Sequence, residues 1–389
     1  MKVAGDWIAR PATQAVCAAL TVAGHRALFV GGCVRNALLG APVSDIDIAT
    51  EARPERVVEL AERAGLKAVA TGIEHGTVTV VSDGLPHEIT TFRRDVETFG
   101  RHAVVAYSDD IREDAARRDF TMNALYALPD GMVVDPLGVG LTDLEARHVR
   151  FVGDAETRIR EDYLRILRFF RFTAWYGDPE AGFDATALAA VAETVEGLAG
   201  LSAERVGGEM TKLLAAPDPA PAVAVMERTG TLAQVLPGAA ARLLAPLVHL
   251  EALTGTPPDP IRRLAALGAG EAEARALRLS KRITRRLALL AELQGAAMAP
   301  AELGYRHGVE AARDALLLRG ALAGTPPEDA ALAAAEEGAR QRFPVAARDL
   351  MPAYEGPALG AKLAELEARW IASGFRLSKE ALLEGAHRP

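Results

Sequence analysis

Two aspartates, Asp45 and Asp47, alternate with isoleucines in the stretch Ser-Asp-Ile-Asp-Ile-Ala-Thr. The alternation is typical of a strand with one buried face, so we expect a strand over residues 44–50 with both carboxylates on the same side. Two like charges there repel each other unless a cation lies between them. Carboxylates that share a site with substrate phosphates suit Mg²⁺, and two such ions would activate a hydroxyl and steady a leaving pyrophosphate. An exposed edge strand with two acids would show the same pattern.

A glycine pair precedes these acids, between an apolar run over residues 27–30 and a segment over residues 34–39. We expect a strand, a tight turn at Gly31 and Gly32, and then the first turns of a helix. Backbone amides at such a junction form an anion cradle, and Arg35 adds a fork-shaped cation. A phosphate cradle followed by a metal-binding strand describes a nucleotidyltransferase. A dinucleotide-binding fold fits less well, because the third glycine of G-x-G-x-x-G is missing.

A third acid, Glu88, follows on another predicted strand. We expect a helix over residues 53–65, which starts at a proline and ends at a glycine, and three strands over 67–70, 76–81 and 87–92. If the last strand lies beside the aspartates, Glu88 completes the metal site and can accept the proton of an attacking hydroxyl. An exposed strand acid is the alternative.

The next motif is Arg-Arg-Asp-Phe-Thr-Met-Asn-Ala-Leu, which contains Arg118 and Asp119. We expect a short helix over residues 121–128 with Asp119 near its cap. Its start would offer donors for phosphate and acceptors for ribose hydroxyls, although a plain capped helix with a salt bridge explains the same residues. Over residues 133–144 we expect a strand, a glycine turn and a helix capped by Thr142 or Asp143.

A long helix is predicted over residues 155–175, with Leu164, Leu167 and Phe170 packed inward. Asp162 and Arg165 are three residues apart and would share one flank of this helix. Adenine and cytosine both place an exocyclic amine beside a ring-nitrogen acceptor, so a carboxylate and a guanidinium side by side would pair with them. Guanine and uracil would leave polar groups unsatisfied. A surface salt bridge is the alternative.

The length and composition are those of a globular protein with at least two domains: the chain has 389 residues, of which 50% are hydrophobic and 25% are charged. The net charge of −8 is unusual for a nucleic-acid binder, but arginines concentrate over residues 93–118, 158–171 and 281–286. The two cysteines lie far apart, which argues against a disulfide framework and for a reducing cytoplasm. We expect no membrane segment and no export signal.

From residue 28 to residue 172 the chain resembles the class II tRNA nucleotidyltransferases and bacterial poly(A) polymerases of the DNA polymerase β superfamily, and in particular the CCA-adding members. The resemblance rests on V-G-G-C-V-R-N-A-L-L-G, S-D-I-D-I-A-T, H-E-I-T-T-F-R, R-R-D-F-T-M-N-A-L and R-E-D-Y-L-R-I-L-R-F-F-R-F. One departure is Asn36, where the family usually has aspartate beside the arginine, so the ion pair at that place is in question.

The resemblance implies an α+β fold: a polymerase-β-like head with a mixed sheet over residues 1–150, a helical neck over 151–215, and a helical body and tail over 216–389 that bind tRNA. It implies Mg²⁺ as cofactor, CTP and ATP as substrates, and catalytic roles for Asp45, Asp47 and Glu88, the two aspartates being metal ligands. The loop over residues 93–112 would help the enzyme pass from adding C to adding A. The nucleotide-binding residues that it implies are Gly32, Arg35, Arg118, Asp119, Asp162, Arg165, Arg168 and Arg171.

Four other functions stay open from the sequence. A bacterial poly(A) polymerase would carry a basic G-[RK]-[RK]-F-x-L stretch before the third acid, where this chain has T-G-I-E-H-G-T-V-T-V. An enzyme that adds only A to tRNA would share the motifs. A transferase acting on a small molecule or protein would need neither the pair at Asp162 and Arg165 nor the long helical half, and a catalytically dead RNA-binding protein would not need the acids.

Overall fold

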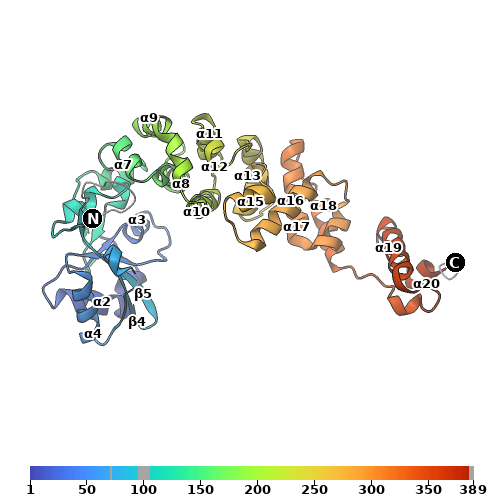
Figure 1. Cartoon of the computed structure of the whole chain (residues 1–389), viewed down its shortest axis with the longest axis horizontal. Helices are drawn as coiled ribbons and strands as arrows, with labels where there is room; N and C mark the ends of the chain where they lie inside the picture. The colour runs from blue at the N-terminus through green and yellow to red at the C-terminus, as the bar shows by residue number, and fades with distance from the viewer. Residues whose placement is uncertain (71, 95–105, 385–389) are drawn as a thin grey trace. The chain divides into compact units, whose positions relative to one another are not determined.

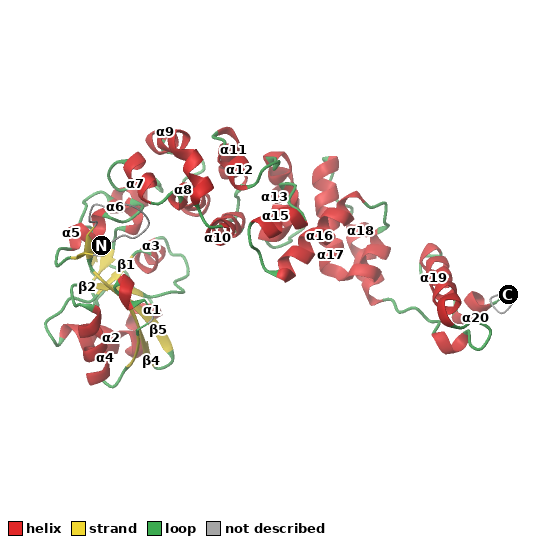
Figure 2. Ribbon diagram, in the orientation of Figure 1, coloured by secondary structure: helices red, strands yellow, loops and turns green. Residues whose placement is uncertain are grey.

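The computed structural model describes residues 1–70, 72–94 and 106–384. The chain forms two compact units, one of Met1–Leu201 with Arg228–Gln234 and one of Ser202–Glu227 with Val235–Pro389. Within the described residues, all strands belong to the first unit and the second is helical (Figures 1 and 2). The predicted α+β class, a mixed N-terminal sheet followed by helices, is confirmed. The predicted boundaries at residues 150 and 215 stay a prediction.

The strands of the first unit are β1 (Leu28–Val30), β2 (Asp47–Thr50), β3 (Lys67–Val69), β4 (Thr77–Ser82), β5 (Leu85–Thr91), β6 (Arg93–Arg94), β7 (Ala106–Tyr107), β8 (Tyr126–Ala127) and β9 (Val133–Val134). Its helices are α1 (Asp6–Ala9), α2 (Pro11–Thr21), α3 (Gly32–Leu38), α4 (Pro54–Arg63), α5 (Ile111–Ala116), α6 (Gly140–Glu145), α7 (Ala155–Glu161), α8 (Leu164–Tyr176) and α9 (Ala185–Thr194), with 3₁₀ turns η1 (Ile73–His75), η2 (Thr121–Asn123) and η3 (Val195–Gly200).

The later helices are α10 (Ala203–Leu214), α11 (Ala220–Arg228), α12 (Thr231–Val235), α13 (Leu244–Leu253), α14 (Pro260–Ala266), α15 (Glu271–Ala276), α16 (Lys281–Gly295), α17 (Pro300–Ala323), α18 (Asp329–Arg340), α19 (Gly356–Ala372) and α20 (Lys379–Leu383), with η4 (Ala241–Leu243) and η5 (Ala347–Asp349). A buried cluster that includes Leu350, Leu366 and Trp370 holds the last helices together. The described residues contain no helix long and apolar enough to cross a membrane.

Seven strands form the main sheet, in the order β3-β4-β5-β2-β1-β8-β9. The central pair β2 and β5 is parallel and the other pairs are antiparallel. Helices α2 and α4 pack against β4 and β5. Because side chains alternate along a strand, Ile48 and Ile89 enter the buried core while their neighbours Asp47 and Glu88 point to the other face. The mixed sheet therefore presents its acids on the face away from α2 and α4.

Four predicted elements differ from the structure. The strand expected over residues 44–50 is shorter, because Asp45 precedes β2. The helix expected over 121–128 is one 3₁₀ turn followed by β8. Tyr126 pairs with Val30 of β1 in the sheet and is fully buried, so tertiary packing overrides the local preference. Helix α6 begins after Val139, which puts Thr142 and Asp143 inside the helix rather than at its cap.

The helix expected over residues 155–175 is two helices. Asp162 ends α7 with extended backbone angles, φ −154° and ψ 102°, and α8 begins two residues later. Leu164, Leu167 and Phe170 are buried as predicted. The predicted shared helical flank of Asp162 and Arg165 is therefore wrong, since the two residues lie on either side of the start of α8.

Candidate nucleotidyltransferase site

The glycine turn lies between β1 and α3, as the sequence predicted. Gly31 has a φ of 70°, which a glycine adopts without strain. A Cβ atom at this position would lie 3.4 Å from Nη1 of Arg118. The turn thus brings the start of α3, at Gly32, close to a guanidinium that comes from a distant part of the chain.

Arg35, in the first turns of α3, is buried and held by uncharged acceptors. Its guanidinium donates to Oδ1 of Asn36 at 2.9 Å, to the hydroxyl of Tyr176 at 2.8 Å and to Oδ1 of Asn123. It also lies 4.0 Å from the centroid of the Tyr176 ring. Burial lowers the pKa of Arg35. Asn36 thus keeps the contact with Arg35, as a neutral hydrogen bond in place of the family's ion pair.

The three predicted acids meet on one face of the sheet. Asp47 of β2 stands directly beside Glu88 of β5 in the parallel register, and Asp45 precedes Asp47 on the exposed approach to the strand. Burial raises the pKa of Asp47 to about 6, with a further contribution from the negative charge of Glu88. Arg118 opposes this rise and Asp45 adds to it. Such a crowd of carboxylates favours a bound cation.

Arg118 is fixed by a buried carboxylate that the sequence analysis did not single out. Nη2 of Arg118 donates to Asp114 at 3.0 Å, and Nε of Arg118 donates to the hydroxyl of Tyr126 at 3.1 Å. The Tyr126 hydroxyl in turn donates to Asp114 at 2.6 Å. Burial alone would raise the pKa of Asp114, but Arg118 and Arg117 lower it to about 2. Arg118 is therefore held beside the acids in a fixed direction.

A hydrogen-bonded chain connects the glycine turn to α8. Asn123 accepts from Arg35 and donates to Oδ1 of Asp119 at 2.9 Å, and Nε of Arg168 donates to Oδ2 of Asp119 at 2.7 Å. Asp119 is buried, and Arg168 contributes to lowering its pKa against the effect of burial. Oδ1 of Asp119 also accepts from the backbone N–H of Phe120, and Oδ2 also accepts from Nη2 of Arg168. Each oxygen thus accepts two hydrogen bonds, so a further donor would have to replace one of these partners.

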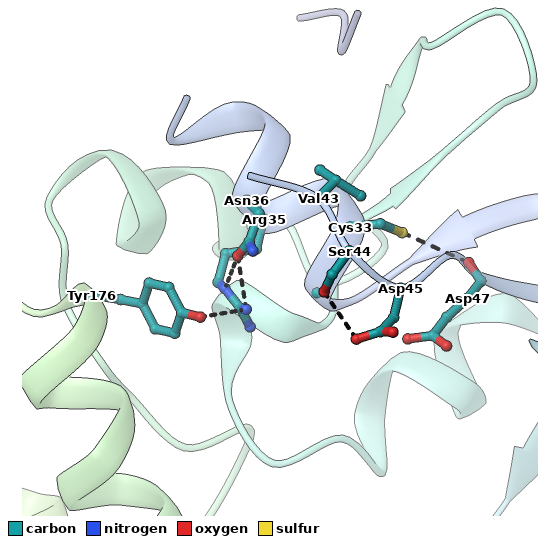
Figure 3. Close-up of a pocket in the computed structure, with 9 residues that line it drawn as sticks. Cys33, Arg35, Asn36, Val43, Ser44, Asp45, Asp47 and Tyr176 are labelled. Atoms are coloured by element: carbon teal, nitrogen blue, oxygen red, sulfur yellow. Dashed lines mark hydrogen bonds between the residues drawn. The ribbon is translucent and has the colours of Figure 1, made fainter. Parts of the chain in front are cut away.

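A pocket of about 220 Å³ opens between the glycine turn and the aspartates (Figure 3). Its polar lining brings together Arg35, Asp45, Asp47 and Tyr176. Gly32, the first residue of α3, also lines it. Figure 3 shows the carboxylates of Asp45 and Asp47 side by side and Arg35 joined to Tyr176. Of the predicted site residues, Gly32, Arg35, Asp45 and Asp47 thus line one cavity.

The other predicted residues do not line this pocket. Arg168 and Arg171 lie over the Phe172 ring, at 5.3 Å and 4.7 Å from its centroid. The guanidinium of Arg165 donates to the carbonyl oxygen of Arg158 at 2.7 Å and to Glu161, both at the end of α7. The predicted loop over residues 93–112 falls largely on residues 95–105, which lie outside the described residues.

Sequence reasoning missed Asn123 and Tyr176 as well as Asp114. Asn123 stands four residues after Asp119 and Asp114 four before Arg118, spacings that could have signalled local contacts. Tyr176 is 141 residues from Arg35. No spacing rule connects residues so far apart, so only the fold could reveal this contact.

The donor set fits Mg²⁺ shared with a substrate. Asp45 and Asp47 offer hard oxygen ligands, and Mg²⁺ characteristically combines one or two carboxylates with waters and phosphate oxygens. Within the described part of the chain, no group of three or more histidine, cysteine or acidic side chains is placed to hold a metal ion, so Glu88 does not complete a three-acid metal site with the two aspartates. Acids beside a glycine turn on a mixed sheet are the arrangement of a nucleotidyltransferase head.

Comparisons with known proteins agree with this class. Residues 27–150 match the poly A polymerase head domain, and residues 183–243 match a domain described as the probable RNA and SrmB-binding site of polymerase A. The mitochondrial CCA tRNA nucleotidyltransferase 1 of Mus musculus is 33% identical over 92% of this chain and 86% of its own length. The CCA-adding enzyme of Geobacillus thermodenitrificans is 43% identical over 56% of this chain and 52% of its own.

A solved structure covers nearly the whole chain. The crystal structure of Bacillus stearothermophilus CCA-adding enzyme in complex with CTP matches 97% of both chains, with a TM-score of 0.74 and 30% identity. Several curated relatives, including the Geobacillus enzyme, are matched over about half of their own length. The chain belongs to the family of class II CCA-adding enzymes and poly(A) polymerase heads.

Proposed function

We propose that this protein adds C, C and A to the 3′ ends of tRNA, using CTP and ATP and no nucleic-acid template. The observation that carries the proposal is the register of β2 and β5, which stands Asp47 beside Glu88 next to the pocket that contains Gly32 and Arg35. Likeness to CCA-adding enzymes over nearly the full chain supports the same activity.

In this proposal Asp45 and Asp47 hold Mg²⁺, which supplies charge neutralisation and activation of the attacking hydroxyl when bound. Glu88 accepts the proton of the RNA 3′-hydroxyl as that oxygen attacks the α-phosphate in line. Arg35 and Arg118 bind the triphosphate, whose far end leaves as pyrophosphate. Their fixed hydrogen bonds orient both guanidinium groups before the substrate arrives, which lowers the cost of binding.

The remaining residues choose the nucleotide. Asp119 binds the ribose and is kept in place by Asn123 and Arg168. Asp162 accepts a hydrogen bond from the exocyclic amine of A or C, and Arg165 donates to the ring nitrogen. Arg168 and Arg171, on the same helix, reach the nucleotide as well. A wrong base leaves these groups unsatisfied in a desolvated site, which is a heavily penalised arrangement.

Transfer to tRNA that lacks its tail tests the proposal. Purified protein is incubated with this RNA and single labelled nucleotides, with and without Mg²⁺. The expected result is metal-dependent addition of C and then A, followed by termination. Addition of A only to RNA that already ends in CC would indicate an A-adding enzyme, and long A tails would indicate a poly(A) polymerase. Incorporation of G or U at rates like those of C would refute base selection by Asp162 and Arg165.

Variants assign the roles. Asp45→Ala should abolish transfer while tRNA binding persists, because the carboxylate holds the metal and not the RNA. Asp162→Ala should retain transfer and lose discrimination between C and U. Asp130→Ala, which removes an exposed carboxylate in a distant turn, is the control and should behave as wild type. Localisation in the cytoplasm stays a prediction, and the named relatives include both mitochondrial and bacterial enzymes.

A further inference from the structure

The break between α7 and α8 has no cause in the local sequence. The stretch Arg-Glu-Asp-Tyr-Leu-Arg contains neither proline nor glycine, and its residues are compatible with one continuous helix. Nevertheless Asp162 adopts extended backbone angles between the two helices. A contact from another part of the fold must therefore hold the chain in this conformation.

The contact lies at Tyr163, whose ring occupies the space above Gly197. A Cβ atom built on Gly197 would lie 2.0 Å from Cε1, 2.1 Å from Cδ1 and 2.4 Å from Cζ of the Tyr163 ring. These distances are far inside van der Waals contact, so any residue other than glycine at position 197 would displace the ring. Gly197 belongs to η3, which follows α9. Tyr163 is thus seated against an element 34 positions further along the chain.

We call the contact of the Tyr163 ring with Gly197 the seat of Tyr163. This seat adjoins Asp162, one of the two residues proposed to select the base. Leu164 N donates to Oδ1 of Asp162 at 3.1 Å, and Arg165 N donates to the carbonyl oxygen of Asp162 at 2.9 Å. The carboxylate therefore accepts from the first backbone N–H of α8, and its direction is set by the break itself. A continuous helix would pair these backbone groups within the helix and turn the Asp162 side chain elsewhere.

The same junction also fixes Arg165. Its Nη1 donates to the carbonyl oxygen of Arg158 at 2.7 Å and to Glu161, and its Nη2 lies 3.4 Å from the carbonyl oxygen of Arg117. Arg158 and Glu161 belong to the last turn of α7. The end of α7 thus positions the guanidinium of Arg165. Tyr163, in contact with Gly197, keeps α7 and α8 as separate helices.

We propose that the Tyr163 ring seated on Gly197 is the positioning device for nucleotide selection: it holds the break between α7 and α8 that directs Asp162 and Arg165 together toward the base. This inference rests on the proposed function and deepens it. Tyr163 and Gly197 are positioning residues, since they act through the two side chains that meet the nucleotide. The expected consequence is that filling the seat changes nucleotide choice more than it changes stability.

The test uses a matched pair of substitutions in the same 3₁₀ turn. Gly197→Ala places a methyl group inside the Tyr163 ring, whereas Gly200→Ala places one in open space. The measurement is the ratio of kcat/KM for CTP to that for UTP on tRNA lacking its tail, together with the thermal unfolding midpoint. Since a displacement of about 1 Å can cost roughly 10²-fold in a preorganised site, we expect Gly197→Ala to lower the ratio by about tenfold or more. Gly200→Ala should keep the wild-type ratio.

A double variant distinguishes loss of the contact between Tyr163 and Gly197 from general destabilisation of the protein. Tyr163→Ala removes the ring and should also lower the ratio, whereas Tyr163→Phe keeps the ring and should not. If Gly197→Ala acts by displacing the ring, it should add no further loss in the Tyr163→Ala background. Tyr163→Ala introduces no clash, so it provides the result even if Gly197→Ala fails to fold.

Asp162→Ala, measured in the same assay, distinguishes the two levels of the proposal. If Tyr163→Ala or Gly197→Ala keeps the wild-type ratio while Asp162→Ala loses discrimination, the positioning role of Tyr163 and Gly197 is overturned. The proposed function would then stay intact. A wild-type ratio in Asp162→Ala would overturn both, because the seat would then position residues that do not select the base.

Discussion

Asn123 accepts a hydrogen bond from Arg35 and donates one to Asp119, which in turn accepts from Arg168. This single amide therefore bridges the triphosphate side and the ribose side of the proposed site. Its two polar atoms serve two different partners, and neither a carboxylate nor an apolar side chain can supply both an acceptor and a donor.

Asn123→Ala should weaken nucleotide binding. Leaving buried polar partners unsatisfied costs about 1–3 kcal/mol, so we expect KM for CTP to rise by roughly tenfold or more. Asn123→Asp keeps the acceptor for Arg35 but sets a second carboxylate against Asp119, and it should also be impaired. Steady-state kinetics with saturating tRNA measure both. A variant with the KM of wild type would show that the bridge does not position the nucleotide.

His87 gives the first unit a pH dependence. Its imidazole is fully buried under α2, with Nε2 3.1 Å from Oγ1 of Thr13, and burial lowers its pKa below the ordinary 6.5. The unfolded chain therefore takes up a proton more readily than the folded one. Stability supplied by neutral His87 is complete above pH 6.5 and is lost as the pH falls through that value toward the folded pKa.

Thermal unfolding at pH 7.5 and 5.5 measures this dependence. We expect the wild-type midpoint to fall at the lower pH and the fall to be smaller in His87→Leu. Asp47, whose pKa is raised to about 6, acts in the opposite direction in both proteins, so the difference between them isolates the histidine. Equal pH dependence in the two proteins would contradict the prediction.

At the scale of elements, aromatic packing attaches α8 to the sheet domain. Phe169 and Phe172 of α8 lie against Phe120, with ring centroids 6.5 Å and 4.8 Å away, and Phe151 lies 5.7 Å from Phe169. All four rings are buried. Since α8 carries Arg165, Arg168 and Tyr176, this packing sets the distance between the helix that we propose selects the base and the acids.

Phe169→Ala should destabilise the first unit by about 3–5 kcal/mol, the usual cost of removing a large buried ring. Urea unfolding, followed by far-UV circular dichroism, measures the loss. Trp175→Ala, in the same helix but with a side chain 40% exposed, should cost much less. Similar losses in the two variants would indicate that the cluster is not what holds α8.

At the scale of the whole molecule, the second unit has its own buried charge network. Arg262 and Arg263 are almost fully buried and donate to the two oxygens of Glu251 at 2.8 and 2.9 Å. Arg262 also donates to Asp314 at 2.8 Å, and Nη1 of Arg263 to the carbonyl oxygen of Leu214 at 2.8 Å. The network ties α10, α13, α14 and α17 together within that unit.

Glu251→Gln should therefore lower the free energy of unfolding of the second unit. Removing one partner of a buried ion pair costs about 3–5 kcal/mol because the remaining charges are uncompensated. Glu310→Gln, whose side chain is 80% exposed, is the control and should be nearly neutral. Nucleotide discrimination should stay unchanged in both variants, since the proposed selecting residues belong to the other unit. Altered choice between CTP and UTP in Glu251→Gln would argue against this separation.

The acids and the glycine turn could be predicted from the sequence, because they depend on local alternation and on turn residues that act over a few positions. The fold class followed from the resemblance of several ordered motifs to a known family. The break at Asp162, the strand at Tyr126 and the partners of Arg35 became visible in the folded structure alone. Each of these depends on residues far apart in the chain: Tyr163 on Gly197, Tyr126 on Val30, and Arg35 on Tyr176. Local propensity is worth tenths of a kcal/mol per residue, whereas burying one large side chain is worth about 1.5–3 kcal/mol, so packing prevails where the two disagree.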